Sequence, residues 1–445
     1  MARVHELLAR EQQRFAEEHP RSYALHQQAA QSLLAGVPMN WMTRWASPVP
    51  PFVAHGKGAR VTDVDGHEYV DLALGDTGAM AGHAPAAAIA AIAEQAARGI
   101  TFMLPTEDSN WAGEEMARRF GLPFWQFTLT ATDANRFVIR LARQITGRPK
   151  IIVHNWCYHG SVDETLATTI DGVVEPRPGN VGPPVHPSET TRVVEFNDID
   201  ALEQALAEGD VACVLAEPAL TNIGIVLPEP GYHDALRELT RKHGTLLVID
   251  ETHTICAGPG GYTAAHDLEP DVLTIGKTIG AGVPAGAYGL SAAVAEAALE
   301  PMSEIGTDVS GVGGTLAGNA LSMAAIRATL GEVLTEEAFT GMIALAERFE
   351  AGVQNTIDEF SAPWHVTRLG CRAEYAFRAS PPRTGAEAAA AGDADLERLI
   401  HLYTMNRGIL LTPFHNMALM SPATTEEDID RHTEVFREAV AEIFA

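Results

Sequence analysis

Residues 271–289 read DVLTIGKTIGAGVPAGAYG, and they predict a buried strand followed by a tight turn that carries one lysine. The run Val272–Ile275 is short, apolar and partly β-branched, as in strands that are buried on both faces. Gly276 lets the backbone turn, and the later glycines leave room for another group to approach the main chain. Lys277 in such a pocket is poorly solvated, which favours the neutral amine that attacks a carbonyl carbon. A surface lysine in a flexible loop is the alternative interpretation, and this stretch by itself does not decide between them.

Strands and helices alternate along the chain around this stretch. Predicted strands lie at 124–130, 150–155, 191–196, 211–216, 245–249 and 272–275, and predicted helices at 134–146, 199–208 and 232–243. Alternation of this kind is typical of a mainly parallel sheet that is covered on both faces. The functional residues of such a sheet lie at the carboxyl ends of its strands.

The segments on either side predict two smaller parts. Residues 4–34 have the spacing of one or two surface helices, and residues 59–74 form two alternating strands joined at Asp65-Gly66, a strong hairpin signal. Further predicted helices lie at 84–97, 108–120, after residue 318 and at 426–444, further strands near 366 and at 373–378, and a loop or disordered insertion at 381–393. We therefore expect an N-terminal arm and hairpin (1–75) that pack on a small C-terminal domain (318–445), with a large domain (76–317) between them.

The composition excludes several classes of protein. With 445 residues and a formal net charge of -27, the chain lacks the basic surface that nucleic acids and anionic membranes need. The four cysteines have no CxxC or metal-ligand spacing, no segment is long and apolar enough to span a bilayer, and no HExxH pattern is present. We expect a cytoplasmic protein with reduced cysteines and no metal site.

Polar side chains follow several predicted strands. Thr130, Ala131, Thr132 and Asp133 lead from one strand straight into a helix, whose free N–H groups suit a phosphate, although plain N-capping explains them too. Residues 154–160, HNWCYHG, place aromatic side chains at the next strand end. Such a cluster either stacks on a flat heterocycle or packs in the core.

Acidic residues end two later strands. Glu217 follows one strand, with Asn222 just beyond it, and Asp250, Glu251, Thr252 and His253 follow the other. A buried carboxylate needs a cation or a hydrogen-bond donor, and a structural salt bridge is the alternative interpretation. The strand ends together offer a phosphate cradle, a stacking aromatic, a buried aspartate and a lysine, which are the four groups that pyridoxal phosphate requires.

The same motifs, in the same order, resemble the class III aminotransferases among the fold-type I pyridoxal phosphate enzymes. The resemblance runs from Pro51 to Ala445 and is carried by DVDGHEYVDL, TATDA, YHG, AEP with Asn222, DETH, GKTIGAGVPAGAYG and GGTLAGNALSMAA. It is strongest to the branch around glutamate-1-semialdehyde aminomutase. It implies an α/β fold with a mainly parallel, seven-stranded sheet in the large domain and a smaller α+β C-terminal domain.

The resemblance also implies roles for single residues. Lys277 becomes the Schiff-base lysine, and Asp250 the partner of the pyridine nitrogen. The other cofactor-binding positions are Ala131 and Thr132 at the phosphate, Tyr158 and Thr252 on the two ring faces, His159 and His253 beside them, and Asn222 near the phenolic oxygen. Thr315 matches a threonine that reaches the phosphate of the neighbouring subunit, which implies a homodimer with shared active sites.

Substrate positions follow in the same way. Arg44 falls where relatives keep an arginine for a substrate carboxylate, a group that guanidinium binds through two hydrogen bonds. Its alternative is a surface arginine beside prolines. Trp41, Trp156 and His415 line the expected substrate pocket, and Phe414-His415-Asn416 stands where the aminomutase has an acidic gate residue.

That departure favours an ordinary aminotransferase over a mutase. We expect ping-pong transfer of an amino group from an amino acid or amine to a keto acid or aldehyde, with Lys277 as Schiff base and proton shuttle. An intramolecular 2,1-aminomutase acting on a semialdehyde is the alternative. A cofactor-binding protein without catalysis and a decarboxylating relative are further alternatives.

Overall fold

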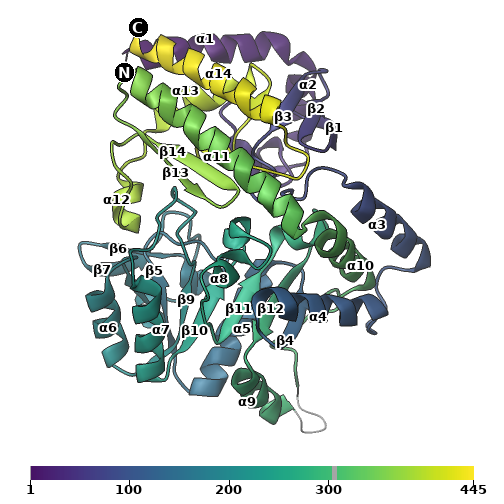
Figure 1. The fold of residues 1–445 in the computed structure, drawn as a ribbon, viewed down its shortest axis with the longest axis vertical. Helices are drawn as coiled ribbons and strands as arrows, with labels where there is room; N and C mark the ends of the chain where they lie inside the picture. Colours follow the sequence, from purple (N-terminus) through teal and green to yellow (C-terminus); the bar gives the residue numbers. More distant parts are fainter. Residues whose placement is uncertain (1, 303–307) are drawn as a thin grey trace. The chain divides into compact units, whose positions relative to one another are not determined.

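The computed structural model describes residues 2–302 and 308–445, which fall into two compact units (Figure 1). Unit 1 comprises Met1–Pro85, Glu337–Pro381 and Ala391–Ala445, and unit 2 comprises Ala86–Glu336 and Pro382–Ala390. The N-terminal arm therefore shares a unit with the C-terminal segment. Helix α10 (Ala320–Ala328) belongs to unit 2, whereas the sequence-based expectation assigned residues after 317 to the small domain.

Unit 2 is built on a seven-stranded sheet in the order β4-β12-β11-β10-β9-β5-β8. Its strands are β4 (Phe124–Thr128), β5 (Lys150–His154), β8 (Thr191–Val194), β9 (Val211–Ala216), β10 (Leu246–Asp250), β11 (Val272–Ile275) and β12 (Gly286–Leu290). The pairs among β11, β10, β9, β5 and β8 are parallel, and β12 is antiparallel to both of its neighbours. The predicted α/β fold with a mainly parallel sheet is confirmed.

Strand β12 is absent from the sequence-based expectation because glycines interrupt its apolar pattern. A Cβ atom added to Gly286 would lie 2.5 Å from the Thr130 carbonyl carbon, and one added to Gly289 would lie 2.5 Å from the Trp125 ring. Both contacts are closer than real side chains approach. The room at these two glycines is therefore filled by β4 and the residues after it, not by a ligand.

Helices cover the sheet of unit 2. Its helices are α3 (Ala86–Arg98), α4 (Glu107–Phe120), α5 (Ala131–Thr146), α6 (Ile199–Ala207), α7 (Tyr232–His243), α8 (Gly261–Ala265), α9 (Ala292–Met302), α10 and α12 (Gly385–Ala389), and it also holds the hairpin β6 (Ala167–Ile170) and β7 (Val173–Pro176). Helix α5 packs along β9, β11 and β12, while α6 and α7 pack on each other and on β8 and β10 (Figure 1). The core between them consists of aliphatic side chains from these strands and helices.

The structure corrects the prediction of a loop or disordered insertion at 381–393. The structure places helix α12 there, and Thr384 caps it by accepting a hydrogen bond from the Glu387 N–H group. A Cβ atom on Gly385 would lie 2.1 Å from the carbonyl oxygen of Asn155, so this turn packs tightly on unit 2. The alanine-rich composition hid a short capped helix.

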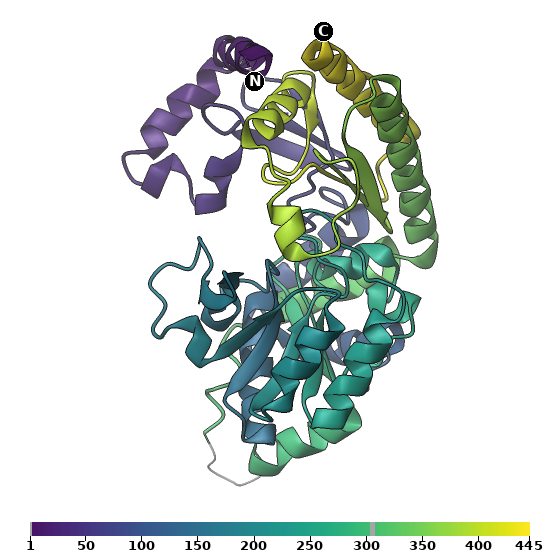
Figure 2. The same cartoon turned by 90° about the vertical axis from the view of Figure 1, so that its left-hand side faces the viewer.

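Unit 1 contains two sheets, β1-β2-β3-β15 and β13-β14-β16. Their strands are β1 (Val53–Lys57), β2 (Arg60–Asp63), β3 (Glu68–Asp71), β15 (Ile409–Leu410), β13 (His365–Leu369), β14 (Arg372–Ala376) and β16 (Met417–Leu419), and the helices are α1 (Ala2–Glu18), α2 (Pro20–Ala29), α11 (Glu336–Glu359), α13 (Ala394–Met405) and α14 (Glu426–Phe444). The predicted hairpin is present as β2 and β3. Helices α11 and α14 lie side by side and are joined by the ion pair of Arg348 with Asp430 (Figure 2).

A buried hydrogen-bond network joins the N-terminal helices to this hairpin. The Tyr69 hydroxyl lies 2.8 Å from Nε2 of His19 and donates to Oδ2 of Asp63 at 2.8 Å. His67 Nδ1 is 3.2 Å from the same Asp63 oxygen, which gives His19, Asp63 and His67 the mutual spacing of metal ligands. Hydrogen bonds account for these distances.

No helix among residues 2–302 and 308–445 has the length and apolar character of a membrane-spanning segment.

Candidate active site

Lys277 lies directly after β11, at the carboxyl end of the parallel strands, on a short 3-10 turn that runs to Gly280. It is half-buried, and its backbone has φ of 54°, a left-handed value that is uncommon for a residue with a side chain. Its Nζ atom lies 2.7 Å from Nε2 of His253. Strained backbone of this kind is concentrated at functional sites, because the surrounding structure must hold it.

Asp250 ends the neighbouring strand β10 and is only 3% exposed. Its Oδ2 atom lies 2.9 Å from Nδ1 of His159 and accepts a hydrogen bond from the Asn135 amide at 2.8 Å, while Oδ1 accepts from the Thr252 N–H group. Burial alone raises the pKa of Asp250, but these hydrogen bonds and the His159 charge outweigh it and hold the pKa below its usual value. The carboxyl group is therefore kept ionised.

His159 is the other half of this buried ion pair. Burial alone lowers the pKa of His159, but the neighbouring Cys157 sulfur and Asp250 carboxylate raise it well above its usual value. Nε2 of His159 is buried and has no hydrogen-bond partner among the described residues. The Nδ1 proton is therefore directed at Asp250, which fixes the orientation of the carboxylate.

Asn135 is a site residue that the sequence did not reveal. It lies on the buried face of α5, donates to Asp250 and to the His159 carbonyl oxygen, and accepts from the Thr274 hydroxyl at 2.7 Å. A single amide thus ties together α5, β10 and β11. The available signal was its position as the fifth residue of the helix, on the apolar stripe, where an uncharged polar residue needs a buried partner.

The predicted phosphate-binding residues lie at the first turn of α5. Thr130 is the N-cap and accepts from the Asp133 N–H group, and Ala131 and Thr132 are half-buried at the start of the helix. The Thr132 hydroxyl accepts from the Ser161 N–H group at 3.3 Å. A Cβ atom on Gly276 would lie 2.9 Å from the Ala131 nitrogen, so the turn before Lys277 closes directly on this helix N-terminus.

Tyr158 lies between this turn and the acid at the end of β9. Its N–H group donates to Oε1 of Glu217 at 3.0 Å, and Oε2 of Glu217 accepts from the backbone and hydroxyl of Thr221. Glu217 is fully buried, which raises its pKa. The Glu217 carboxyl group therefore holds the backbone at Tyr158 and at Thr221 in place through hydrogen bonds. Asn222 follows in the same loop and is half-buried.

Thr315 and Trp156 are the two other predicted residues of unit 2. Thr315 is exposed in the segment before α10. Trp156 is half-buried, and the Arg177 guanidinium lies 5.2 Å from the centre of its ring. Trp156 therefore packs against a cation of its own unit.

Arg44, Trp41 and His415 belong to unit 1. Arg44 is exposed at the end of the 3-10 turn Asn40–Arg44, and the Trp41 ring on the same turn meets the Phe414 ring edge-on at 4.9 Å. The turn around Arg44 and the segment around His415 are thus brought together, although they are far apart in sequence. The two segments that were expected to bind substrate form one surface of unit 1.

His415 itself is held in a buried network. Its Nδ1 lies 3.3 Å from Oε1 of Glu374, whose other oxygen pairs with the buried Arg372. Burial alone raises the pKa of Glu374, but His415 and Arg372 lower it overall. Burial and the charge of Glu374 raise the pKa of nearby Glu397 to about 7. His415 is therefore fixed by a carboxylate rather than placed on a mobile loop.

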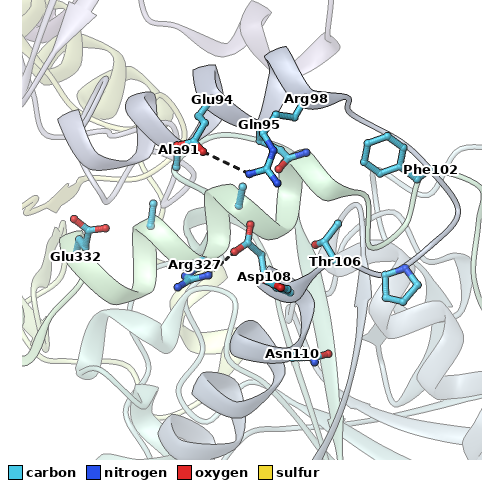
Figure 3. Close-up of a pocket in the computed structure, with 14 residues that line it drawn as sticks. Ala91, Glu94, Gln95, Arg98, Phe102, Thr106, Asp108, Asn110, Arg327 and Glu332 are labelled. Atoms are coloured by element: carbon cyan, nitrogen blue, oxygen red, sulfur yellow. Dashed lines mark hydrogen bonds and ion pairs between the residues drawn. The ribbon is translucent and has the colours of Figure 1, made fainter.

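A separate pocket of about 810 Å³ lies between α3, α4 and α10 of unit 2 (Figure 3). Its side chains come mainly from charged and amide residues, and two ion pairs, Asp108 with Arg327 and Glu94 with Arg98, lie within it. None of the predicted site residues lines it. The catalytic candidates are thus confined to the strand ends.

These residues fit pyridoxal phosphate on the chemistry of their donors. The ionised Asp250 suits a protonated pyridine nitrogen, the α5 N-terminus suits a phosphate, and Lys277 supplies the amine. The buried Asp250 and His159 pair is held from three elements, so its orientation is set before any ligand arrives. A cofactor would gain from such preorganisation.

Known proteins support this assignment. The model of the family described as aminotransferase class-III matches residues 41–440. Glutamate-1-semialdehyde 2,1-aminomutase of Sorangium cellulosum is 36% identical over 436 residues, which cover 96% of this chain and 97% of that protein. The structure is similar to a glutamate-1-semialdehyde aminomutase from Pseudomonas aeruginosa PAO1, with a TM-score of 0.97, 53% identity and 99% of both chains covered.

Two further structures extend the comparison. A lysine-to-alanine variant of the Pseudomonas protein, solved in complex with PMP, superimposes with a TM-score of 0.96. An omega-transaminase from Sphaerobacter thermophilus is 29% identical with a TM-score of 0.87, and the match covers 95% of this chain and 97% of that one. The chain belongs to the class-III aminotransferase family of pyridoxal phosphate enzymes.

Proposed function

We propose that this enzyme is an intramolecular 2,1-aminomutase that moves an amino group between adjacent carbons of an amino aldehyde carrying a carboxylate. The observation that carries the proposal is similarity over nearly the whole chain to proteins named glutamate-1-semialdehyde aminomutase, at 53% and 36% identity. Asp250, His159 and Lys277 serve either reaction equally well. The choice between mutase and transaminase therefore rests on the relatives.

The residues of unit 2 divide the chemistry among them. When bound, pyridoxal phosphate supplies an aldehyde for the amine and a ring that withdraws electrons from the adjacent carbon. Asp250, oriented by His159 and Asn135, would keep the ring nitrogen protonated. Lys277 would take up and return the protons on the two carbons that flank the transferred nitrogen. The amino group enters and leaves the same carbon skeleton, so no second substrate is consumed.

Arg44 is our candidate for the substrate carboxylate. It is exposed on a turn whose Trp41 packs on Phe414, so a polar and an apolar group lie on one surface of unit 1. Arg44→Ala should raise KM for carboxylated substrates about tenfold or more and leave KM for simple amines unchanged. An equal rise for both classes would remove Arg44 from the substrate site. Exposed Arg14, in an ion pair with Glu18, provides the control substitution.

A substrate test separates the two reactions. The holoenzyme is incubated with glutamate 1-semialdehyde alone, and the products are separated by chromatography and identified by NMR spectroscopy. A mutase converts it to the isomeric amino ketone without releasing any product that has lost the amino group. Release of one equivalent of keto product from an amino donor, with no isomerisation of the semialdehyde, would overturn the proposal. Evolved carbon dioxide would indicate a decarboxylase instead.

Transamination between two substrates is the second candidate, and one observation favours it. His415 stands where the aminomutase resemblance places an acidic gate residue, and it is fixed by Glu374 in a buried network. A held imidazole is poorly suited to closing over a retained intermediate. A panel of amino donors, followed by loss of the visible cofactor absorbance, would identify the substrate of such a transaminase.

We also propose a homodimer in which Thr315 of one subunit contacts the phosphate of the other. The exposure of Thr315 supports this proposal. A second support is the run of three consecutive apolar residues in unit 2, Phe102, Met103 and Leu104, whose side chains are 47%, 74% and 73% exposed. Sedimentation should give a dimer, and Thr315→Ala should weaken cofactor binding. A monomer with full activity would contradict both.

All four cysteines are buried thiols, which supports a cytoplasmic location.

A further inference from the structure

The Lys277 amine lies beside a second nitrogen base. Nζ of Lys277 is 2.7 Å from Nε2 of His253, and the His253 side chain is 9% exposed. His253 follows Asp250 by three residues, so it comes from the end of β10, while Lys277 comes from the end of β11. The two strands are paired in parallel register, with Asp250 opposite Thr274, which brings both residues to the same edge of the sheet.

The acidic groups at this edge have other partners. Asp250 is hydrogen bonded to His159 and Asn135, and Glu251 accepts from the Thr254 hydroxyl at 2.6 Å and from two backbone N–H groups. Glu217 accepts from the loops at Tyr158 and Thr221. Asp250, Glu251 and Glu217 are thus the acidic groups whose hydrogen bonds the structure gives at these strand ends, with Lys277 as the basic group. These carboxylates are thus hydrogen bonded to His159, Asn135, hydroxyl groups and backbone N–H groups, and the His253 imidazole lies at hydrogen-bond distance from the lysine.

Two positive charges at 2.7 Å in a partly buried place repel, so the pair is disfavoured when both nitrogens are protonated. The favoured arrangement has one proton between the two nitrogens. We infer that His253 is a catalytic base that accepts the proton of the Lys277 ammonium group and so delivers the lysine as a neutral amine. In this step one N–H bond of Lys277 breaks, one forms at Nε2 of His253, and the charge moves to the imidazole.

The inference rests on the proposed use of Lys277 with pyridoxal phosphate. Lys277 must be neutral when it attacks the cofactor aldehyde and again when it removes a proton from carbon. A base at hydrogen-bond distance provides an acceptor for the Lys277 proton in both events. Attachment of the cofactor needs no substrate, so it tests His253 independently of which reaction the enzyme catalyses.

The experiment measures how fast apoprotein takes up pyridoxal phosphate, followed by visible absorbance, between pH 6 and 9. His253→Met removes the base, and His253→Gln keeps a hydrogen-bonding group that does not accept a proton in this range. We expect both variants to attach the cofactor about tenfold or more slowly at pH 7 and to approach the wild-type rate at pH 9. The first-order proton-transfer rate with substrate should show the same shift in its pH profile.

Each outcome has a defined meaning. A wild-type profile in His253→Gln with a slow His253→Met variant would show that His253 only positions the lysine, which overturns the inference. A loss of rate that is equal at every pH would also overturn it, because a misplaced lysine is slow at all pH values. Lys277→Ala, which takes up no cofactor into visible absorbance, sets the baseline. If wild type attaches cofactor normally but isomerises nothing, the proposed function fails and the role of His253 stands.

Discussion

At the scale of single residues, the site depends on side chains that each have several partners. Asn135 contacts Asp250, His159 and Thr274, so α5, β10 and β11 are joined by one amide. Asp250 is in turn held by donors from three segments. Buried polar groups that are satisfied in this way are rigid, which is what orientation of a flat cofactor ring requires.

Replacement of Lys277 is the most direct test at this scale. Lys277→Ala should abolish the visible absorbance of the lysine-bound cofactor and reduce kcat by about 10³-fold or more, because both the nucleophile and the base are removed. Lys242, an exposed lysine paired with Glu203, is the matched control. Lys242→Ala should change neither quantity. Full turnover in Lys277→Ala would contradict the whole assignment of the site.

The sequence indicated Lys277 and Asp250 because a lysine in a glycine-rich turn and an acid directly after a buried strand are patterns that can be recognised from sequence. It did not indicate Asn135, or the 2.7 Å contact of His253 with Lys277, because both depend on strand register. Register is fixed by tertiary packing, and the two residues of such a contact lie far apart in the chain. The roles of the predicted cofactor and substrate residues stay predictions.

At the scale of elements, the turn after β11 and the N-terminus of α5 form one structure. Gly276 has an extended φ of -157°, so its small size, not its backbone freedom, is what the position requires. A Cβ atom there would lie 2.9 Å from the Ala131 nitrogen and 3.0 Å from its Cβ atom. The helix end that is our candidate for the phosphate would have to move to accept a larger residue.

Gly276→Ala should therefore weaken pyridoxal phosphate binding about tenfold or more, which corresponds to about 1.4 kcal/mol. Equilibrium titration of apoprotein with the cofactor measures this. Gly113, inside α4, is the control because a Cβ atom there meets nothing within 4 Å. Gly113→Ala should leave cofactor affinity unchanged and raise the free energy of unfolding by about 1 kcal/mol. Unchanged affinity in Gly276→Ala would separate this turn from the phosphate site.

Strands with a continuous apolar run and helices with a clear amphipathic pattern were predicted well. Strands β9 and β11 and helix α14 have the predicted boundaries, because apolar runs and a capped amphipathic helix report directly on burial. Strand β12 and helix α12 were missed. Both elements contain glycines where the chain packs closely, β12 against β4 and α12 against Asn155. Such packing depends on the tertiary structure, so local sequence patterns do not reveal it.

At the scale of the molecule, buried histidines set the response to acid. Burial lowers the pKa of His154 and His432 to about 3, and of His233 and His401 to about 4. Their ordinary pKa in an unfolded chain is about 6.5, so the unfolded chain binds more protons below that pH. Their contribution to stability is present above pH 6.5 and is lost as the pH falls from 6.5 toward 4.

His432 isolates this effect in unit 1. It is fully buried between Phe349 and Phe436, and neither ring nitrogen has a hydrogen-bond partner among the described residues. His432→Leu should gain stability relative to wild type by up to about 1.4 kcal/mol per pH unit between pH 6 and 4, as measured by urea denaturation. Val435→Ala, a core substitution without a titratable group, should give a constant difference. A constant difference for His432→Leu as well would show that it is not buried neutral.

The connectivity of unit 1 has a consequence for synthesis on the ribosome. Strand β15 pairs in parallel with β3, matching Ile409 with Val70, so the first sheet of the chain is completed only by one of its last segments. The strands of the seven-stranded sheet lie between Phe124 and Leu290. Because domains fold as their residues emerge, the strand ends that carry Lys277 and Asp250 can assemble while β15 is still untranslated. The N-terminal hairpin, made first, waits longest for its partner, and its unpaired edge is the part of the nascent chain that most needs protection from aggregation.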